Sequence, residues 1–342
     1  MTLPASQARI LFVCAAGPSV GGGHVMRSLT LARALEARGA NCAFRATPEV
    51  AAVLEAFAPD MARAQTDEGF DALVFDSYAL TANDHRAVAK GRPTLVIDDL
   101  ADRPLAADLV LDSGLARRAE DYAGLVPSSA RLLFGPAYAP VRPAFAALRE
   151  AALARRAEPG PVRRILVSLG LTDVGGITGR VVSLLRPILG DTALDIVLGG
   201  AAPSLPALQT LAGEDPRLTL HIDTQDMPRL ALEADLAIGA GGSTAWERCV
   251  LALPALTLVL ADNQVAPAQA LEMAGATVGL AASAPDFEVA FVREVQALLA
   301  DAARRTALSA ASATVCDGLG ADRVAQALLD LLNAPPLRQP AP

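Results

Sequence analysis

The chain has 342 residues, which is more than one hydrophobic core usually organises, and this length predicts about two domains. Apolar residues make up 52% of the sequence and aromatic residues only 4%, so the core must consist mainly of Ala, Leu and Val, as in buried parallel strands and alanine-rich helices. The formal net charge of −8 argues against nucleic-acid binding, because that function needs clustered Lys and Arg.

Short apolar runs alternate with longer helical patterns, and this alternation predicts an α/β fold whose parallel sheets are covered on both faces. The apolar run 10–16 lacks a preceding basic region and enters a glycine-rich turn, so we interpret it as a first strand and not as a signal peptide. In the first half we expect helices at 25–38, 49–57 and 81–89, and strands at 10–14, 41–45, 72–75, 94–97, 109–111 and 132–134.

A break with Pro136, Pro140 and Pro143, followed by an arginine- and proline-rich segment at 155–161, predicts an exposed linker. We therefore place an N-terminal Rossmann-like domain at 1–150, a C-terminal one at 151–333 and a disordered tail at 334–342. The second half restarts the strand–turn–helix pattern at Arg164, with further strands near 194–198, 218–221, 236–238 and 256–260 and helices at 286–300 and 321–332.

The cysteine spacing and the lengths of the apolar runs predict a cytoplasmic protein. Cys14, Cys42, Cys249 and Cys316 lie far apart without a C-x-x-C pair, which fits reduced thiols and not a disulfide framework. No apolar run reaches the roughly 18 residues that a transmembrane helix needs. We therefore expect no membrane partner and no nucleic-acid partner.

A glycine-rich turn at 21–23 follows the first strand and leads into a helix that begins beside His24. Such a turn lets a ligand approach main-chain N–H groups at a helix N-terminus, and the helix dipole there disfavours the imidazolium form of a histidine. A neutral imidazole at a cleft can act as a general base. From the residues alone, a tight turn with a surface histidine is an equally good interpretation.

A second glycine-rich turn at 239–242 also follows a buried strand and precedes a helix. Ser243 and Thr244 can cap that helix, and free N–H groups at 241–244 can face a diphosphate. Glu247 lies one turn into the helix, where its carboxylate can accept hydrogen bonds from two ribose hydroxyls. The same carboxylate could instead complete a capping box with Ser243 or Thr244, and the spacing does not distinguish the ribose-binding role from the capping role. Trp246 is expected in the core.

Weaker signals occur where other strands end, which is the edge at which open α/β sheets bind ligands. They are the segments 75–78, 98–99, 168–173 and 262–264. His85 and His221 have no metal-ligand spacing, and no D-x-D motif occurs. We therefore predict no metal and no cofactor, and neutralisation of a diphosphate by main-chain amides and the helix dipole.

Several motifs in order resemble the UDP-sugar hydrolases of pseudaminic acid biosynthesis over most of residues 8–333. They are Gly22-Gly-His-Val-Met-Arg-Ser-Leu-Thr-Leu-Ala, Asp76-Ser-Tyr78, Ile97-Asp-Asp99, Phe134-Gly-Pro-Ala-Tyr138 with Arg142-Pro, Gly239-Ala-Gly-Gly-Ser-Thr-Ala-Trp-Glu-Arg-Cys, and Asn263-Gln264. The resemblance implies the GT-B fold, with two Rossmann-like domains facing a cleft, related to the peptidoglycan N-acetylglucosaminyltransferase. This sequence departs from the family at Ser77, where the family has a histidine, and at Leu171, where the family has a small residue.

The resemblance implies metal-independent, inverting hydrolysis of UDP-2,4-diacetamido-2,4,6-trideoxy-β-L-altropyranose at C1, releasing UDP and free sugar for nonulosonate synthesis and flagellin or surface glycosylation. His24 matches the catalytic base. The expected substrate-binding residues are Gly22, Gly23, Arg27, Tyr78, Asn263 and Gln264. The expected nucleotide-binding residues are Gly170, Thr172, Met227, Gly241, Gly242, Ser243, Thr244 and Glu247.

Two other hypotheses remain open at this point. The same scaffold could transfer the sugar from a UDP-amino sugar to an acceptor hydroxyl, or the chain could be a binding module for sugar nucleotides that has no catalytic activity. A UDP-sugar is the one ligand that we predict, and protein partners are left open.

Overall fold

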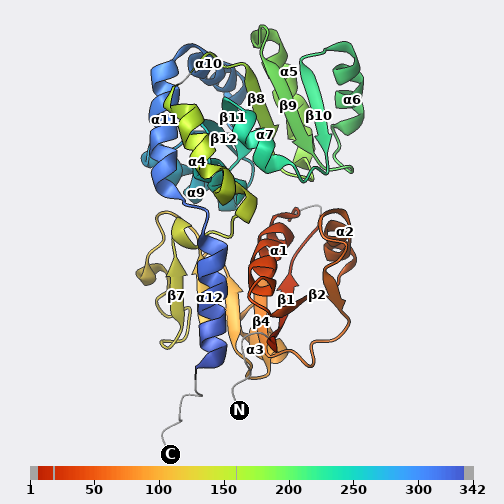
Figure 1. The fold of residues 1–342 in the computed structure, drawn as a ribbon, viewed down its shortest axis with the longest axis vertical. Helices are drawn as coiled ribbons and strands as arrows, with labels where there is room; N and C mark the ends of the chain where they lie inside the picture. The colour runs from red at the N-terminus through yellow and green to blue at the C-terminus, as the bar shows by residue number, and fades with distance from the viewer. Residues whose placement is uncertain (1–6, 18–19, 159, 335–342) are drawn as a thin grey trace, which may run out of the picture.

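A computed structural model of the chain describes residues 7–17, 20–158 and 160–334. The predicted disordered tail lies outside the described residues except for Ala334. The described chain forms two halves, each built on one parallel sheet, and they lie one above the other in Figure 1.

The first half contains a seven-stranded parallel sheet in the order β3-β2-β1-β4-β5-β6-β7. Its helices include α1 (Gly23–Glu36), α2 (Pro48–Phe57) and α3 (Ala82–Ala89), and its strands are β1 (Arg9–Cys14), β2 (Asn41–Arg45), β3 (Ala62–Ala64), β4 (Ala72–Asp76), β5 (Thr94–Ile97), β6 (Leu109–Asp112) and β7 (Arg131–Phe134). The central strands are apolar and buried, which follows from helix packing on both faces of a parallel sheet.

The second half contains a six-stranded parallel sheet in the order β10-β9-β8-β11-β12-β13. Its strands are β8 (Arg164–Ser168), β9 (Ala193–Leu198), β10 (Leu218–Ile222), β11 (Leu236–Ala240), β12 (Ala255–Val259) and β13 (Val278–Ala281). The helices that follow them are α5 (Ile177–Leu185), α6 (Leu205–Glu214), α7 (Met227–Glu233), α8 (Thr244–Val250), α9 (Val265–Met273), α10 (Phe287–Ala300) and α11 (Ala302–Val315). Every predicted strand is present, and the two that the sequence did not predict, β3 and β13, are short edge strands.

Two helices do not follow the predicted division of the chain at 150/151. The helix α4 (Pro143–Ala157) spans the predicted boundary at 150/151 and covers the start of the predicted linker, and its Phe145 and Ala152 lie in a core with Trp246 and other residues of the second half. The helix α12 (Gly320–Asn333) returns to the first half and packs on α1, as the lower part of Figure 1 shows. Its buried Val324 and Leu328 belong to the core of the N-terminal sheet.

The chain therefore crosses between the halves twice, before α4 and before α12, and the two crossings lie side by side. Arg323 Nη1 donates to the Ala137 carbonyl oxygen at 2.8 Å, and Arg149 Nη1 donates to the Cys316 carbonyl oxygen at 3.0 Å. At Gly320 a Cβ atom would overlap the Ala139 main chain, so only glycine allows this close approach.

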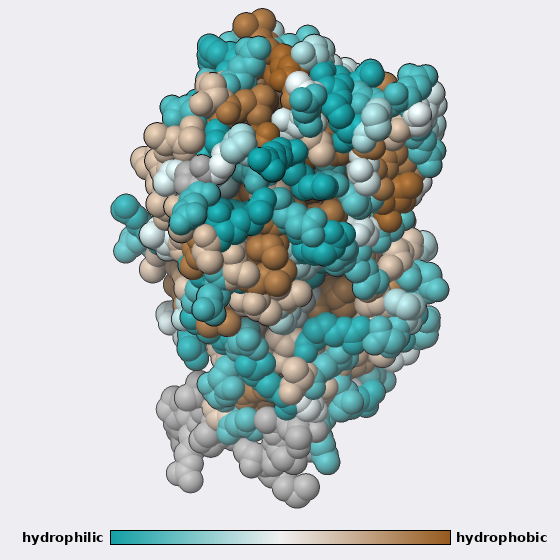
Figure 2. Space-filling view, turned by 45° about the horizontal axis from the view of Figure 1, so that its top comes forward, coloured by the Kyte–Doolittle hydropathy of each residue, from teal (hydrophilic) through white to brown (hydrophobic). Residues whose placement is uncertain are grey.

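The surface shown in Figure 2 is mostly hydrophilic, with small and separated hydrophobic areas. Across the described ranges, no helix combines the length and the hydrophobicity that crossing a membrane requires. All four cysteines are buried free thiols, and burial raises the pKa of Cys249 to about 12.

Candidate functional site

The two predicted glycine turns face each other across the space between the halves. A cavity of about 150 Å³ is lined by the start of α1 in the first half and by the turn before α8 in the second. We call it the histidine cavity, and it brings together the predicted site residues Gly23, His24, Arg27, Tyr78, Gly241, Gly242, Ser243, Asn263 and Gln264. The carboxyl ends of both parallel sheets meet here, as expected for ligand sites in open α/β sheets.

His24 is held by a carboxylate beneath it. Its Nδ1 lies 2.5 Å from Asp76 Oδ1, and the exposed fractions of the two side chains are 6% and 0%. An ionised carboxylate can only accept a hydrogen bond, so Nδ1 carries the proton and Nε2 is left as an acceptor. Arg27 Nη2 lies 3.1 Å from the same Nδ1, but both atoms are donors in this arrangement, so we assign Arg27 to the carboxylate.

Asp76 ends β4 and accepts hydrogen bonds from three side chains of α1. Arg27 donates from Nε at 2.7 Å and from Nη2 at 2.6 Å, and Ser28 donates its hydroxyl at 3.1 Å. Burial opposes ionisation of this carboxyl group, but the Arg27 guanidinium and His24 together hold its pKa well below the usual range. Asp76 is therefore a permanent acceptor that fixes the orientation of His24.

Arg27 extends this network to the next strand. Its Nη1 donates to Asp99 Oδ2 at 2.8 Å, and Arg117 Nη2 donates to the Asp99 carbonyl oxygen at 2.7 Å. Asp99 also lines the histidine cavity, and its Oδ1 has no hydrogen-bond partner among the residues that the structure describes. The sequence marked segments 75–78 and 98–99 only as weak signals at strand ends, and it did not indicate that Arg27 joins them.

Tyr78 and Asn263 meet over His24 from opposite halves of the protein. The Tyr78 ring contacts the His24 ring edge to face, with centroids 4.6 Å apart, and Asn263 Nδ2 donates to the Tyr78 hydroxyl at 3.4 Å. Burial and the neighbouring Asp99 raise the pKa of Tyr78, so its hydroxyl stays protonated and can donate to a ligand.

A second cavity of about 110 Å³ adjoins the histidine cavity, because Arg27, Pro140 and Ser243 line both. We call it the Glu247 cavity. It brings together five of the predicted nucleotide-binding residues: Gly170, Met227, Ser243, Thr244 and Glu247. The other three lie elsewhere, since Gly241 and Gly242 line the histidine cavity and Thr172 lines a third space.

The third space is a wider, mainly apolar chamber of about 740 Å³ between the halves. Val53 and Phe57 of α2 and Leu171 and Thr172 of the second half line it, and so does Gly22. We call it the apolar chamber. The predicted substrate residue Gly22 therefore lines this chamber, while the next residue, Gly23, lines the histidine cavity.

The Glu247 carboxylate is paired with Arg142, a residue whose role the sequence did not predict. Arg142 Nε and Nη2 both lie 3.0 Å from Glu247 Oε1, and the two residues are 105 positions apart. The Ser243 side chain makes no capping hydrogen bond, so the alternative capping box with Ser243 does not form. Arg142 could have been flagged only by its place in the Arg142-Pro motif.

One predicted donor in the second glycine turn is already used. Gly241 N–H donates to the Leu258 carbonyl oxygen at 3.1 Å, because the turn still continues the sheet at that residue. The N–H groups of Gly242 and Ser243, by contrast, donate to no main-chain carbonyl oxygen outside helices and strands within the described part of the chain. The prediction of a free donor is therefore wrong at Gly241, and for the residues 242–244 it stays a prediction.

Within the described ranges, no group of three or more His, Cys, Asp or Glu side chains is arranged to hold a metal ion. His85, for which we predicted no metal, is a buried residue of α3, and burial together with Arg103 lowers its pKa to about 4. His221 is paired with Asp195 at 2.8 Å in the second half and lines none of the three spaces described above.

The fold has close counterparts among solved structures. MurG of Acinetobacter baumannii matches with a TM-score of 0.65 and 18% identity, covering 94% of this chain and 99% of that one. S. aureus MnaA in complex with UDP matches with a TM-score of 0.66 and 14% identity, covering 95% and 97%. The fold is GT-B. This agrees with the predicted pair of Rossmann-like domains facing a cleft.

Two curated proteins resemble the sequence. The spore coat polysaccharide biosynthesis protein SpsG of Bacillus subtilis (strain 168) is 29% identical over 210 residues, which is 60% of this chain and 60% of that protein. The UDP-2,4-diacetamido-2,4,6-trideoxy-beta-L-altropyranose hydrolase of Campylobacter jejuni is 23% identical over 280 residues, covering 78% of this chain and 97% of that protein. These matches confirm the predicted resemblance as a remote relationship. No family model matches the chain.

Proposed function

We propose that this chain is an enzyme acting on a UDP-sugar, and that it hydrolyses the bond between C1 of the sugar and the diphosphate. The observation that carries the proposal is the geometry of His24, whose Nδ1 is tied to Asp76 while Nε2 remains an acceptor in the histidine cavity. The remote similarity to a hydrolase of a UDP-linked diacetamido sugar and the fold shared with a UDP-bound protein support the substrate class.

In the proposed reaction, His24 Nε2 takes a proton from a water molecule as the water oxygen bonds to C1. The bond between C1 and the phosphate oxygen breaks, its electron pair leaves with UDP, and the configuration at C1 is inverted. Asp76 stabilises the imidazolium that forms. UDP needs no protonation to leave, so the pair of carboxylic groups used by ordinary glycosidases is not required.

The position of the diphosphate follows from the two adjoining cavities. Ser243 lines both, so a diphosphate at this turn would have its sugar beside His24 and its nucleoside beside Glu247. The N–H groups of Gly242 and Ser243 would donate to phosphate oxygens, and the Glu247 carboxylate would accept from the ribose hydroxyls. Because this site uses amides and side chains, we propose that turnover needs no divalent metal.

The test is incubation with UDP-2,4-diacetamido-2,4,6-trideoxy-β-L-altropyranose and no acceptor, in the presence of EDTA, with UDP and free sugar followed by NMR. We expect equal amounts of UDP and free sugar, with the inverted anomer appearing first. Dependence on added Mg²⁺ would contradict the metal-free site. Tight UDP binding without turnover of any UDP-sugar would contradict the enzyme and favour a binding module.

Glycosyl transfer is the second candidate, and the apolar chamber favours it, since it could admit an acceptor beside the first glycine turn. Its nucleophile would be an acceptor hydroxyl and not water. Slow UDP release without an acceptor, accelerated by a hydroxyl-bearing acceptor that ends up glycosylated, would support transfer over hydrolysis.

A further inference from the structure

Arg248 of α8 is a buried cation beneath the second glycine turn, and its exposed fraction is 7%. Its guanidinium lies against the end of β11, where a Cβ atom at Gly239 would overlap it. The glycine at 239 therefore makes room for a charge and does not form a turn. This gives a physical reason for the first glycine of the 239–242 segment.

The hydrogen-bond acceptors of Arg248 are all neutral. Nη2 donates to the Ala240 carbonyl oxygen at 2.9 Å and to Thr257 Oγ1 at 3.3 Å, and Nη1 donates to Thr244 Oγ1 at 3.3 Å. Within the described ranges no carboxylate forms an ion pair with Arg248, since its neighbour Glu247 pairs with Arg142. Arg27, at the other glycine turn, is paired with both Asp76 and Asp99.

A buried charge without a counter-ion is costly, and burial accordingly lowers the pKa of Arg248. An anion bound nearby would remove that cost. Arg248 borders a small space together with Ser168, Thr244 and Glu247, and these three residues also line the Glu247 cavity. The cation is thus adjacent to the site where the proposed function places the nucleotide.

Thr244 provides the direct connection. Its hydroxyl oxygen accepts from Arg248, which leaves the hydroxyl hydrogen free to be donated to a ligand in the Glu247 cavity. The guanidinium therefore orients a donor at the turn and adds positive charge behind it.

We propose that Arg248 is a positioning residue that supplies the counter-charge for the diphosphate, and that UDP is the missing partner of this buried cation. The proposal rests on the proposed nucleotide site. It explains how a site without a metal could hold a diphosphate in a chain with an excess of acidic residues.

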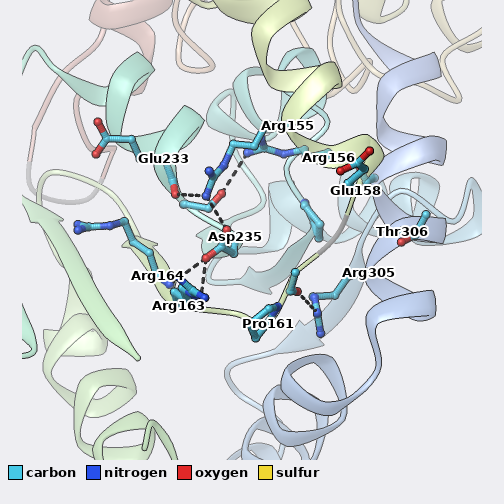
Figure 3. A pocket seen from close by; sticks show the side chains of 14 residues that line it. Arg155, Arg156, Glu158, Pro161, Arg163, Arg164, Glu233, Asp235, Arg305 and Thr306 are labelled. Atoms are coloured by element: carbon cyan, nitrogen blue, oxygen red, sulfur yellow. Dashed lines mark hydrogen bonds and ion pairs between the residues drawn. The ribbon is translucent and has the colours of Figure 1, made fainter. Parts of the chain in front are cut away.

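Arg305 provides a matched control. It is also buried, with an exposed fraction of 4%, and it donates only to carbonyl oxygens of Leu298, Leu299 and Gly160. It lines a separate pocket at the opposite edge of the C-terminal sheet, where the strands begin (Figure 3). The carbonyl oxygens of Leu298 and Leu299 lie at the C-terminal end of α10, where the helix dipole favours a cation.

The experiment compares binding of UDP and uridine to the full-length protein by calorimetry, using R248Q, R248K and R305Q. The two ligands share base and ribose and differ in the phosphates. We expect R248Q to weaken UDP binding about tenfold or more and to change uridine binding less than about twofold, since the lost interaction is between charges. R248K should keep UDP binding within about threefold, and R305Q should change neither ligand.

If Arg248 has only a structural role, R248Q should lower the melting temperature and leave the ratio of UDP affinity to uridine affinity unchanged. An unchanged ratio in folded R248Q overturns the proposal. If R248Q does not fold, R248K decides, because a loss of UDP affinity of about tenfold or more in that variant contradicts a role for charge. If the wild type binds UDP no more tightly than uridine, the proposed nucleotide site itself is wrong.

Discussion

At the scale of single residues, the chemistry depends on pairs that are distant in the sequence. His24 and Asp76 are 52 positions apart, and Arg142 and Glu247 are 105 apart. Local patterns place His24 beside a glycine turn and Glu247 one turn into a helix. They do not reveal the partner that fixes each side chain, because that partner comes from a different element.

Replacing His24 with Asn should lower kcat about 10²- to 10⁴-fold if the imidazole is the general base. UDP affinity should be nearly unchanged, because the proposed nucleotide contacts come from the other half of the protein. Single-turnover kinetics and UDP calorimetry measure the two effects separately.

His221→Asn is the matched control, since His221 also pairs with a buried aspartate, Asp195, but lines none of the three spaces between the halves. We expect it to affect stability and not the rate of the folded protein. A near-wild-type single-turnover rate in folded H24N would rule out the proposed role of His24.

Replacing Glu247 with Gln should weaken UDP binding by about 1.5–3 kcal/mol, the contribution of a hydrogen bond to a charged group. Arg142→Gln breaks the same ion pair but leaves the carboxylate in the cavity, so it should keep most of the UDP affinity. Calorimetry on both variants makes the comparison. Equal losses would assign the effect to the ion pair and not to the ribose contact.

At the scale of elements, short apolar runs predicted the strands well because a buried parallel strand needs apolar residues on both faces. The helix α4 was missed because the prolines at and before its first residue and its arginine-rich end are also typical of an exposed linker. In the structure Pro143 begins that helix, and Arg156 donates to the carbonyl oxygens of Ala231 and Ala234 in the second half. Neither of these two hydrogen bonds of Arg156 can be predicted from the local sequence. The helical pattern of α12 was predicted, but a pattern does not specify the sheet on which a helix packs.

Leu328→Ala in α12 should destabilise the first half by about 2–5 kcal/mol, because Leu328 is fully buried in the N-terminal core. Gln326→Ala, at an exposed position of the same helix, should cost less than about 0.5 kcal/mol.

Unfolding in urea measures the effect of these substitutions, and each half carries its own probe. Cys14 and Cys42 are buried in the first half, and Trp246, the one tryptophan, lies in the core of the second. In L328A, labelling of the two thiols should begin at lower urea than in the wild type, while the Trp246 fluorescence transition moves less. Equal shifts of both probes would show that α12 does not act on the first half in particular.

At the scale of the whole molecule, the second half is an insertion between β7 and α12 of the first. Its cores are complete without α12. A fragment of residues 140–319 should therefore show a single cooperative unfolding transition on its own, measured by circular dichroism. A fragment of residues 1–139 should not, until a peptide containing α12 is added. Cooperative unfolding of 1–139 alone would contradict this division.

The packing of α12 on α1 also sets an order for synthesis on the ribosome. The first strand is made roughly 300 residues before the helix that completes its core, a delay of about 15–60 s at ordinary rates of translation. During that time the apolar face that α12 will cover is open to aggregation, while the inserted half can already fold. A chain terminated after residue 319 would thus have a finished second half, an unfinished first half and no complete cleft.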